Sequence, residues 1–266
     1  MRPRVAGELH PDQVGLDRHG LRARPGPRTG PRPRPAAETR GRDRERDPRT
    51  RPANETHSRG AAMRTGIIGT GRIGSTLARI LVAAGHQVVL ANARGPQTLG
   101  PLVAELGRAA SAAHPAEAAD RAELLVLMVP FERVRGLLPP YAVQDKVLVD
   151  ATNAFGGPGT PADLGGRGSS DLVAEWYPDA QVVKSLNTMH FETLAVAGTA
   201  PGERLAHFTA GDDMKAKEIV AGIITDLGFA PVDTGPLHSG GILQQPGGPL
   251  FNRPLTEAQA LAWISH

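Results

Sequence analysis

A glycine-rich turn between an apolar run and a helical segment constrains the fold of this chain more than any other feature. Gly69, Gly71 and Gly74 stand at G-x-G-x-x-G spacing directly after an apolar run. Residues 75–84 then show helical periodicity, and a second apolar run occupies 87–91. A strand, a tight turn, a helix and a second strand make a βαβ unit, the context in which this glycine pattern indicates dinucleotide binding.

Each glycine of the turn has a different mechanical role. Gly69 makes the tight turn, Gly71 lets a pyrophosphate approach the backbone, and Gly74 lets the helix pack closely on the strand. The helix that begins near the turn directs its free N–H groups and its positive dipole end at the phosphates. We therefore predict that the turn contacts the cofactor through Gly69, Thr70, Gly71, Arg72, Ile73 and Gly74.

Short apolar runs alternate with helical segments beyond this unit, which is typical of a doubly wound parallel sheet of the Rossmann type. We expect strands near 65–69, 87–91, 109–112, 123–129, 146–150 and 181–185, and helices near 72–84, 97–107, 115–121, 131–138 and 169–177. The connection from Asn153 to Gly168 holds six Gly and two Pro. Because it follows a strand at the edge where ligands bind, we interpret it as a loop that covers a ligand.

The sequence predicts three regions. Residues 1–62 form a leader, residues 63–183 form the NADP-binding Rossmann domain, and residues 184–266 form a small C-terminal α/β lobe. In the lobe we expect helices near 190–197, 213–227 and 255–264, with strands near 205–210 and 229–233.

The leader carries fifteen Arg, eight acidic residues, nine Pro and seven Gly, and few large apolar side chains. Such a segment cannot bury enough surface to offset its ordering entropy, so we expect it to be disordered. A nucleic-acid-binding arm is one interpretation, but acids are interleaved with the arginines and no aromatic residue is present for base stacking. The favoured interpretation is a start codon assigned upstream of the true one at Met63.

The composition excludes several classes of site. The chain has no cysteine, which rules out disulfides and thiolate chemistry and is compatible with a reducing cytoplasm. No apolar run approaches the roughly 18 residues that span a bilayer. The nine histidines are scattered and no hydrolase motif is present, so we predict no metal site. The expected partners are a small-molecule hydride acceptor or donor and a second copy of the chain in a homodimer, with no membrane and no nucleic acid.

The residues after the second strand indicate which nicotinamide cofactor is bound. NAD-selective sites place an acidic residue there for the ribose 2′-hydroxyl, but this chain continues as Asn92, Ala93 and Arg94. The missing carboxylate removes repulsion toward a 2′-phosphate, and Arg94 offers a planar donor fork for one. We predict NADP as the cofactor, although Arg94 could instead be a solvated loop residue.

Several motifs together make the chain resemble the NADPH-dependent F420 reductase family. They are Gly66–Gly74, Ala91–Pro96, Val129–Phe131, Asp150–Asn153, Lys184–Thr188 and Ala210–Asp213. The resemblance runs from Met63 to the C-terminus. It implies a Rossmann domain with a small C-terminal α/β lobe, and hydride transfer between NADP and the deazaflavin coenzyme F420. It also implies that Thr70, Asn92 and Arg94 surround the 2′-phosphate and the adenosine ribose, with Ala93 where many relatives have Ser.

Small polar residues follow three strands at the expected ligand edge. Val129 and Pro130 end one strand, Asn153 follows the next, and Asn187 and Thr188 end the one after. We predict that these residues bind the cofactor or a second ligand, although the proline could be only a strand stop.

His190 is the one histidine that we expect near this edge, and it is a weak catalytic candidate. A carbonyl reductase would use it as a proton donor, whereas hydride transfer between stacked rings needs mainly proximity and orientation. We therefore assign no certain catalytic residue. Two alternatives stay open, an NADPH-dependent imine or carbonyl reductase of the pyrroline-carboxylate type and a non-enzymatic NADP-binding sensor.

Overall fold

The computed structural model describes residues 61–198 and 202–265, and the fold below is that of this part of the chain. The predicted leader, except for its last two residues, lies outside these ranges. In the described ranges no helix is both long and apolar enough to cross a membrane.

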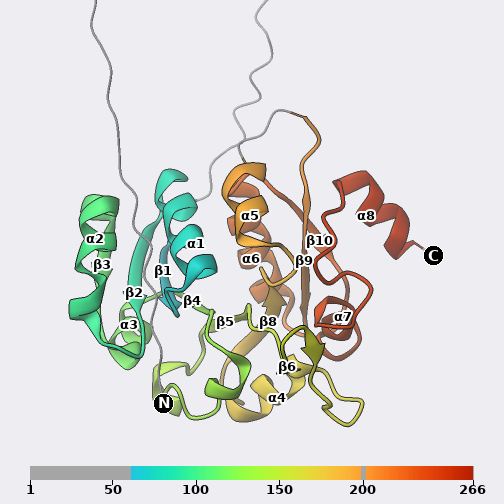
Figure 1. Cartoon of the computed structure of the whole chain (residues 1–266), viewed down its shortest axis with the longest axis horizontal. Helices are drawn as coiled ribbons and strands as arrows, with labels where there is room; N and C mark the ends of the chain where they lie inside the picture. The colour runs from blue at the N-terminus through green and yellow to red at the C-terminus, as the bar shows by residue number, and fades with distance from the viewer. Residues whose placement is uncertain (1–60, 199–201, 266) are drawn as a thin grey trace, which may run out of the picture. The chain divides into compact units, whose positions relative to one another are not determined.

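One large mixed sheet organises the described chain (Figure 1). Across the sheet the strands follow the order β10 (Ala230–Asp233), β9 (Ala206–Gly211), β8 (Gln181–Ser185), β5 (Val147–Asp150), β4 (Leu124–Leu127), β1 (Arg64–Ile68), β2 (Gln87–Ala91) and β3 (Ala110–Ala112). Six neighbouring strands are parallel to one another, as the sequence predicts: β8, β5, β4, β1, β2 and β3. From β1 the chain moves outward to β2 and β3 and then returns to the other side of β1 as β4. The strand order therefore reverses between β1 and β4, and a doubly wound sheet binds its ligand at such a point.

Helices cover both faces of this sheet. They are α1 (Arg72–Ala83), α2 (Gly100–Leu106), α3 (Pro115–Arg121), α4 (Ser169–Trp176), α5 (Phe191–Ala197), α6 (Met214–Asp226), α7 (Leu237–Gln244) and α8 (Glu257–Ile264). Alternate strand residues point to opposite faces, so Ile67 packs in the same core as residues of α1, α5 and α6, whereas Ile68 packs with residues of α3, α4 and α7. Because both faces are covered, β4 and the first three residues of β5 read as continuous apolar runs in the sequence.

The two C-terminal strands, for which the sequence predicts no direction, extend the sheet in the opposite sense. β9 pairs antiparallel with β8, with Val183 opposite Gly211, and β10 pairs parallel with β9. The chain leaves β8 at the edge of the glycine turn, forms α5 and enters β9 from that same edge, so β9 runs back across the sheet. The predicted division between residues 183 and 184 falls within β8, and the strands after it extend the same sheet.

One predicted helix is shorter in the structure, and two elements of the structure were not predicted. The helix expected over 131–138 is only one turn, η3 (Phe131–Arg133), because Gly136 has a φ of 72° and two prolines follow at 139 and 140. The loop 153–168 contains a small antiparallel pair, β6 (Phe155–Gly157) and β7 (Thr160–Pro161). Helix α7 has no counterpart in the sequence-based expectation, because its central Gly240 and Gly241 are poor helix formers.

Candidate functional site

The glycine turn between β1 and α1 has the geometry that the motif predicts. Gly69 has a φ of 114°, and a Cβ atom there would overlap the backbone oxygen of Met128. A Cβ at Gly74 would overlap the backbone oxygen of Gly69, so any larger residue would push α1 away from the turn. Around Gly71, by contrast, a Cβ would meet no atom within 4 Å. Gly69 and Gly74 are therefore required by the packing of the turn itself, whereas Gly71 leaves open space for a ligand.

The N-terminus of α1 borders this open space. Gly71 is the N-cap residue, no side chain caps the helix, and its first turn holds no acidic residue. The N–H groups of that turn are consequently available to phosphate oxygens, and the helix dipole favours negative charge there. Arg72 is exposed at the start of the helix, with its guanidinium carbon 5.5 Å from the ring centre of Phe191 in α5.

Asn92 joins the glycine turn to the loop after β2. Its Nδ2 donates to the hydroxyl oxygens of Thr70 at 3.3 Å and Thr98 at 3.0 Å, while its Oδ1 accepts from the backbone N–H of Arg94 at 2.9 Å. Gln97 Nε2 donates to the carbonyl of Arg94 at 3.1 Å. The backbone around Arg94 is thus held from two sides.

The Arg94 side chain is exposed and forms no ion pair with any residue of 61–198 or 202–265. A fixed backbone with a solvated guanidinium suits recognition of a phosphate, because the planar fork can make two charge-assisted hydrogen bonds without losing an internal partner. The structure therefore brings Thr70, Asn92 and Arg94 together at one side of the turn, where the sequence predicts the 2′-phosphate site.

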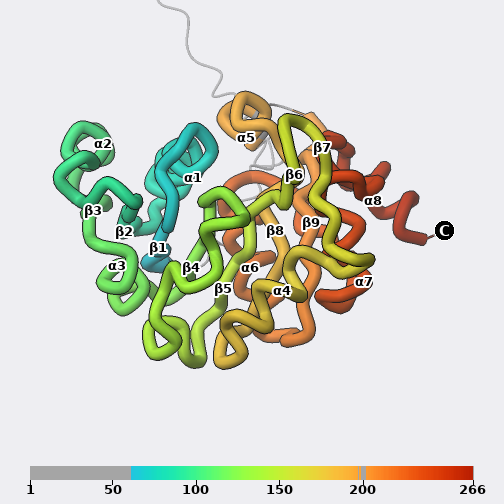
Figure 2. Tube along the Cα trace, turned by 60° about the horizontal axis from the view of Figure 1, so that its bottom comes forward, coloured from blue at the N-terminus to red at the C-terminus, as the bar shows by residue number. Residues whose placement is uncertain are grey.

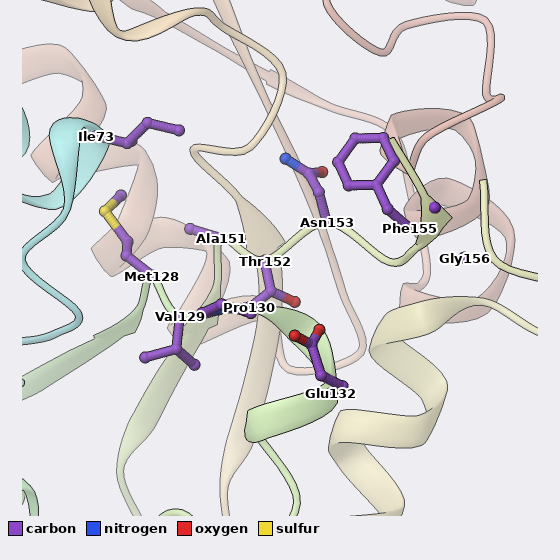
Figure 3. Close-up of a pocket in the computed structure, with 11 residues that line it drawn as sticks. Ile73, Met128, Val129, Pro130, Glu132, Ala151, Thr152, Asn153, Phe155 and Gly156 are labelled. Atoms are coloured by element: carbon purple, nitrogen blue, oxygen red, sulfur yellow. The ribbon is translucent and has the colours of Figure 1, made fainter. Parts of the chain in front are cut away.

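A pocket of about 500 Å³ lies where the glycine turn meets the carboxyl ends of β4 and β5 (Figure 3). The chain passes from the carboxyl end of β5 directly into β6 and β7, so this strand pair lies at the same edge of the sheet as the pocket (Figure 2). The lining residues are Ile73, Met128, Val129, Pro130, Glu132, Ala151, Thr152, Asn153, Phe155, Gly156 and Gly157. Of the predicted site residues, Ile73, Val129, Pro130 and Asn153 thus share one pocket.

Asn187 lies behind the pocket and not in its lining. It is 3% exposed, and its Nδ2 donates to Asn153 Oδ1 at 3.1 Å and to the carbonyl of Gln244 at 2.8 Å. Asn153 Nδ2 in turn donates to the carbonyl of Asn187 at 3.2 Å. The preceding Leu186 has a φ of 58°, a strained conformation for a leucine. Asn187 therefore orients Asn153, and the neighbouring Thr188 is also buried, at 2% exposure.

A buried ion pair that the sequence reasoning did not assign to the site lies next to the pocket. Asp150 and Lys184 are both fully buried, with 3.1 Å between Oδ2 and Nζ. Burial alone would raise the pKa of the Asp150 carboxyl, but the Lys184 ammonium and hydrogen bonds from Ser170 and Thr152 hold that pKa below its ordinary value. The signal in the sequence was a charged residue directly after a pair or run of apolar strand residues, Asp150 after residues 147–149 and Lys184 after Val182 and Val183, since such charges need a partner when buried.

Glu132 and Phe155 also line the pocket without having been predicted. Phe155, at the start of β6, is 44% exposed and packs edge to face with Phe251 at 6.0 Å between ring centres. Glu132 belongs to the turn η3, which the sequence presented as the first turn of a longer helix. Neither position carries a recognisable motif, so only the folded chain brings them to the site.

His190 lies outside the pocket lining. Its side chain is 56% exposed, its Nδ1 is 3.4 Å from Glu192 Oε2, and its ring packs on Phe191 at 4.7 Å. The residue is the N-cap position of α5. The structure thus places His190 at the surface beside Glu192 and not among the residues that line the pocket.

Residues 64–154 match the family model described as "NADP oxidoreductase coenzyme F420-dependent". This range contains the glycine turn, the Asn92 loop and most of the pocket lining.

Solved structures and a curated relative resemble the chain over a wider range. A hypothetical protein from Sinorhizobium meliloti is 35% identical with a TM-score of 0.67, covering 74% of this chain and 96% of that one. A proposed F420-dependent NADP reductase from Arthrobacter sp. FB24 is 27% identical with a TM-score of 0.58, covering 66% and 86%. Metalloreductase STEAP3 from Rattus norvegicus is 31% identical over 180 residues, which span 67% of this chain but only 35% of that protein.

Proposed function

The chain belongs to the family of coenzyme F420-dependent NADP oxidoreductases, and we propose that it transfers hydride between NADP(H) and the deazaflavin ring of coenzyme F420 or a similar planar acceptor. Membership of an NADP-dependent oxidoreductase family gives the cofactor class. The identity of the acceptor is our proposal, and so is a cytoplasmic site of action, which fits a chain without cysteine.

The residues of the glycine turn fit NADP. The open side of Gly71 and the uncapped start of α1 suit the pyrophosphate, and the solvated guanidinium of Arg94 suits the 2′-phosphate. When bound, NADPH supplies a hydride, that is, two electrons and one proton. The acceptor ring takes this hydride on carbon and a proton from water on nitrogen, and NADP⁺ remains.

The pocket beyond the turn is the observation that carries the proposal. Its volume of about 500 Å³ lies within the range of pockets that bind small molecules and cofactors. Ile73 and Met128 link it to the glycine turn, and Phe155 with its two following glycines forms its far side. An aromatic side chain at such a rim suits a flat ring, because stacked and edge-to-face contacts add to the burial of apolar area.

Among the described residues, the pocket lining contains no histidine, lysine or tyrosine, which favours hydride transfer without a proton relay through such a group. Glu132 is the one ionisable side chain among the lining residues, and His190 is paired with Glu192 outside them. A site of this kind accelerates the reaction by holding the two rings close and aligned, which is the main requirement of hydride transfer.

The test is to mix the purified protein with NADPH and oxidised F420 and to follow the loss of the visible absorbance of the deazaflavin. We expect bleaching that depends on the protein, with His190→Ala slowing turnover only modestly. No bleaching, together with NADPH consumption by a small ketone or imine and a loss on the order of 10²-fold or more in His190→Ala, would favour the carbonyl or imine reductase. Tight NADPH binding without turnover of any acceptor would favour the sensor.

A further inference from the structure

Thr152 presents only a hydrogen-bond acceptor to the pocket. Its backbone N–H donates to Asp150 Oδ1 at 3.0 Å, and its hydroxyl donates to the same oxygen at 2.6 Å. Its carbonyl accepts from Lys184 Nζ at 2.6 Å. Thr152 is 2% exposed and both of its donors are used inside the protein, so the lone pairs of its hydroxyl oxygen are the side-chain hydrogen-bonding capacity that it has left at the pocket wall.

The carboxylate that holds the Thr152 hydroxyl cannot easily release it. Asp150 is fully buried, and its other oxygen accepts from Ser170 Oγ at 2.6 Å and from Lys184 Nζ at 3.1 Å. A buried carboxylate loses a large part of its stabilisation with each donor removed, so its hydrogen bonds persist. The orientation of the Thr152 hydroxyl is consequently fixed by the ion pair behind it.

Glu132 adds a second acceptor on the same side. Figure 3 shows its carboxylate directed toward the part of the pocket where the Thr152 oxygen lies. An ionised carboxylate accepts hydrogen bonds and donates none. None of the lining residues named above is Lys, Arg or His, so no cation of the lining offsets this negative charge. We call Glu132 and Thr152 the acceptor edge of the pocket.

We propose that the acceptor edge selects hydride acceptors whose ring presents an N–H donor or a positive charge to it, and that Glu132 is the specificity-determining residue. This inference rests on the proposed function and narrows its substrate class. An imide edge, with an N–H between two carbonyls, meets the requirement: its N–H would donate to the acceptor edge, and a carbonyl would accept from the remaining Nδ2 hydrogen of Asn153. A ring with a carboxylate or only lone pairs at this edge is disfavoured by repulsion and by the loss of a donor.

The test compares two probes that differ at one atom, 5-deazariboflavin, which carries the imide N–H, and its N3-methyl derivative. Calorimetric titration into the complex of the full-length protein with NADP⁺ should show about 10-fold tighter binding of the N–H probe, as expected for a charge-assisted hydrogen bond. In Glu132→Ala the preference should fall to about 2-fold or less, with Glu132→Gln between the two because its amide oxygen still accepts. Glu218→Ala, which removes an exposed carboxylate on α6 outside the pocket lining, should leave the preference unchanged.

Equal affinity of the two probes for the unaltered protein would overturn the inference, as would a full preference retained in Glu132→Ala. Binding of neither probe would overturn it as well. Reduction of F420 by NADPH is measured separately, so that the two proposals fail differently. Preference for the N–H probe without reduction of F420 would retain the acceptor edge and refute the hydride-transfer function, whereas reduction of F420 without this preference would do the reverse.

Discussion

Lys184 Nζ lies 3.1 Å from Asp150 Oδ2, with both side chains fully buried, so an ion pair joins β5 to β8 beside the residues that line the pocket. The pair holds Thr152 through three hydrogen bonds, two to Asp150 Oδ1 and one from Lys184 Nζ. Its place at the ends of two neighbouring parallel strands makes the pocket floor part of the rigid sheet.

Lys184→Met keeps the apolar stem of the side chain but leaves the Asp150 carboxylate buried without a counter-charge. We expect the free energy of unfolding, measured by urea denaturation, to fall by about 3–5 kcal/mol. Arg79→Met is the matched control, because it breaks an exposed pair with Glu105 and should cost less than about 1 kcal/mol. Similar small losses in both variants would show that the buried pair contributes no more than a surface one.

Gly71 and Gly69 should respond differently to alanine. In Gly71→Ala the added methyl group meets no protein atom, so the melting temperature should stay unchanged while NADPH affinity falls by about 10-fold or more, since the methyl occupies the space of the pyrophosphate. Gly69→Ala combines a positive φ with an overlap on the Met128 backbone, so it should lower the melting temperature itself. Unchanged NADPH binding in Gly71→Ala would argue against a phosphate site at this turn.

Arg94→Ala should weaken NADPH binding by roughly 1.5–3 kcal/mol and leave NADH binding nearly unchanged, because the guanidinium contact to the 2′-phosphate has no counterpart in NADH. Titration of both cofactors by fluorescence measures the two affinities. Arg108→Ala removes another exposed arginine, and we expect it to affect neither cofactor. Equal losses for NADPH and NADH in Arg94→Ala would mean that the residue supports the loop and does not read the phosphate.

His207 makes stability depend on pH. Burial lowers the pKa of its imidazole to about 4, and neither ring nitrogen has a hydrogen-bond partner among the described residues. In the unfolded chain the pKa is about 6.5, so between these values protons bind preferentially to the unfolded state. The stabilisation from the neutral imidazole is fully present above pH 6.5 or so and decreases by roughly 3 kcal/mol as the pH falls to about 4.

The measurement is the free energy of unfolding at several pH values in the unaltered protein and in His207→Leu. The variant should lose this part of the slope between about pH 6.5 and pH 4, because leucine does not titrate. His190→Leu, at an exposed position, should keep it. An unchanged slope in His207→Leu would contradict the assignment.

The sequence predicts most of this sheet because its parallel strands are buried on both faces and read as apolar runs between helical segments. Ile67 and Ile68 illustrate this, since each packs in a different core. The direction of β9 is set by where the chain re-enters the sheet after α5, and a local pattern of apolar residues carries no information on that point.

The candidate site also contains a part that could be predicted from the sequence and a part that could not. The glycine turn and the Asn92 loop are local and could be predicted from spacing. The contributions of Asp150, Glu132 and Phe155 depend on partners far away in the chain, such as Lys184 and Phe251. The prediction that Asn187 contacts a ligand stays open, because in the structure it reaches the pocket through Asn153.

Direct transfer of hydride from NADPH to the deazaflavin is the central claim, and isotope transfer tests it most directly. The protein is mixed with oxidised F420 and NADPH deuterated at nicotinamide C4, in separate reactions with the two stereoisomers, and the reduced coenzyme is analysed by mass spectrometry. Because the two rings must face each other for transfer, one stereoisomer should yield reduced F420 with a single deuterium and the other should yield none. Reduced F420 without deuterium from either stereoisomer, or no reduction at all, would contradict the account.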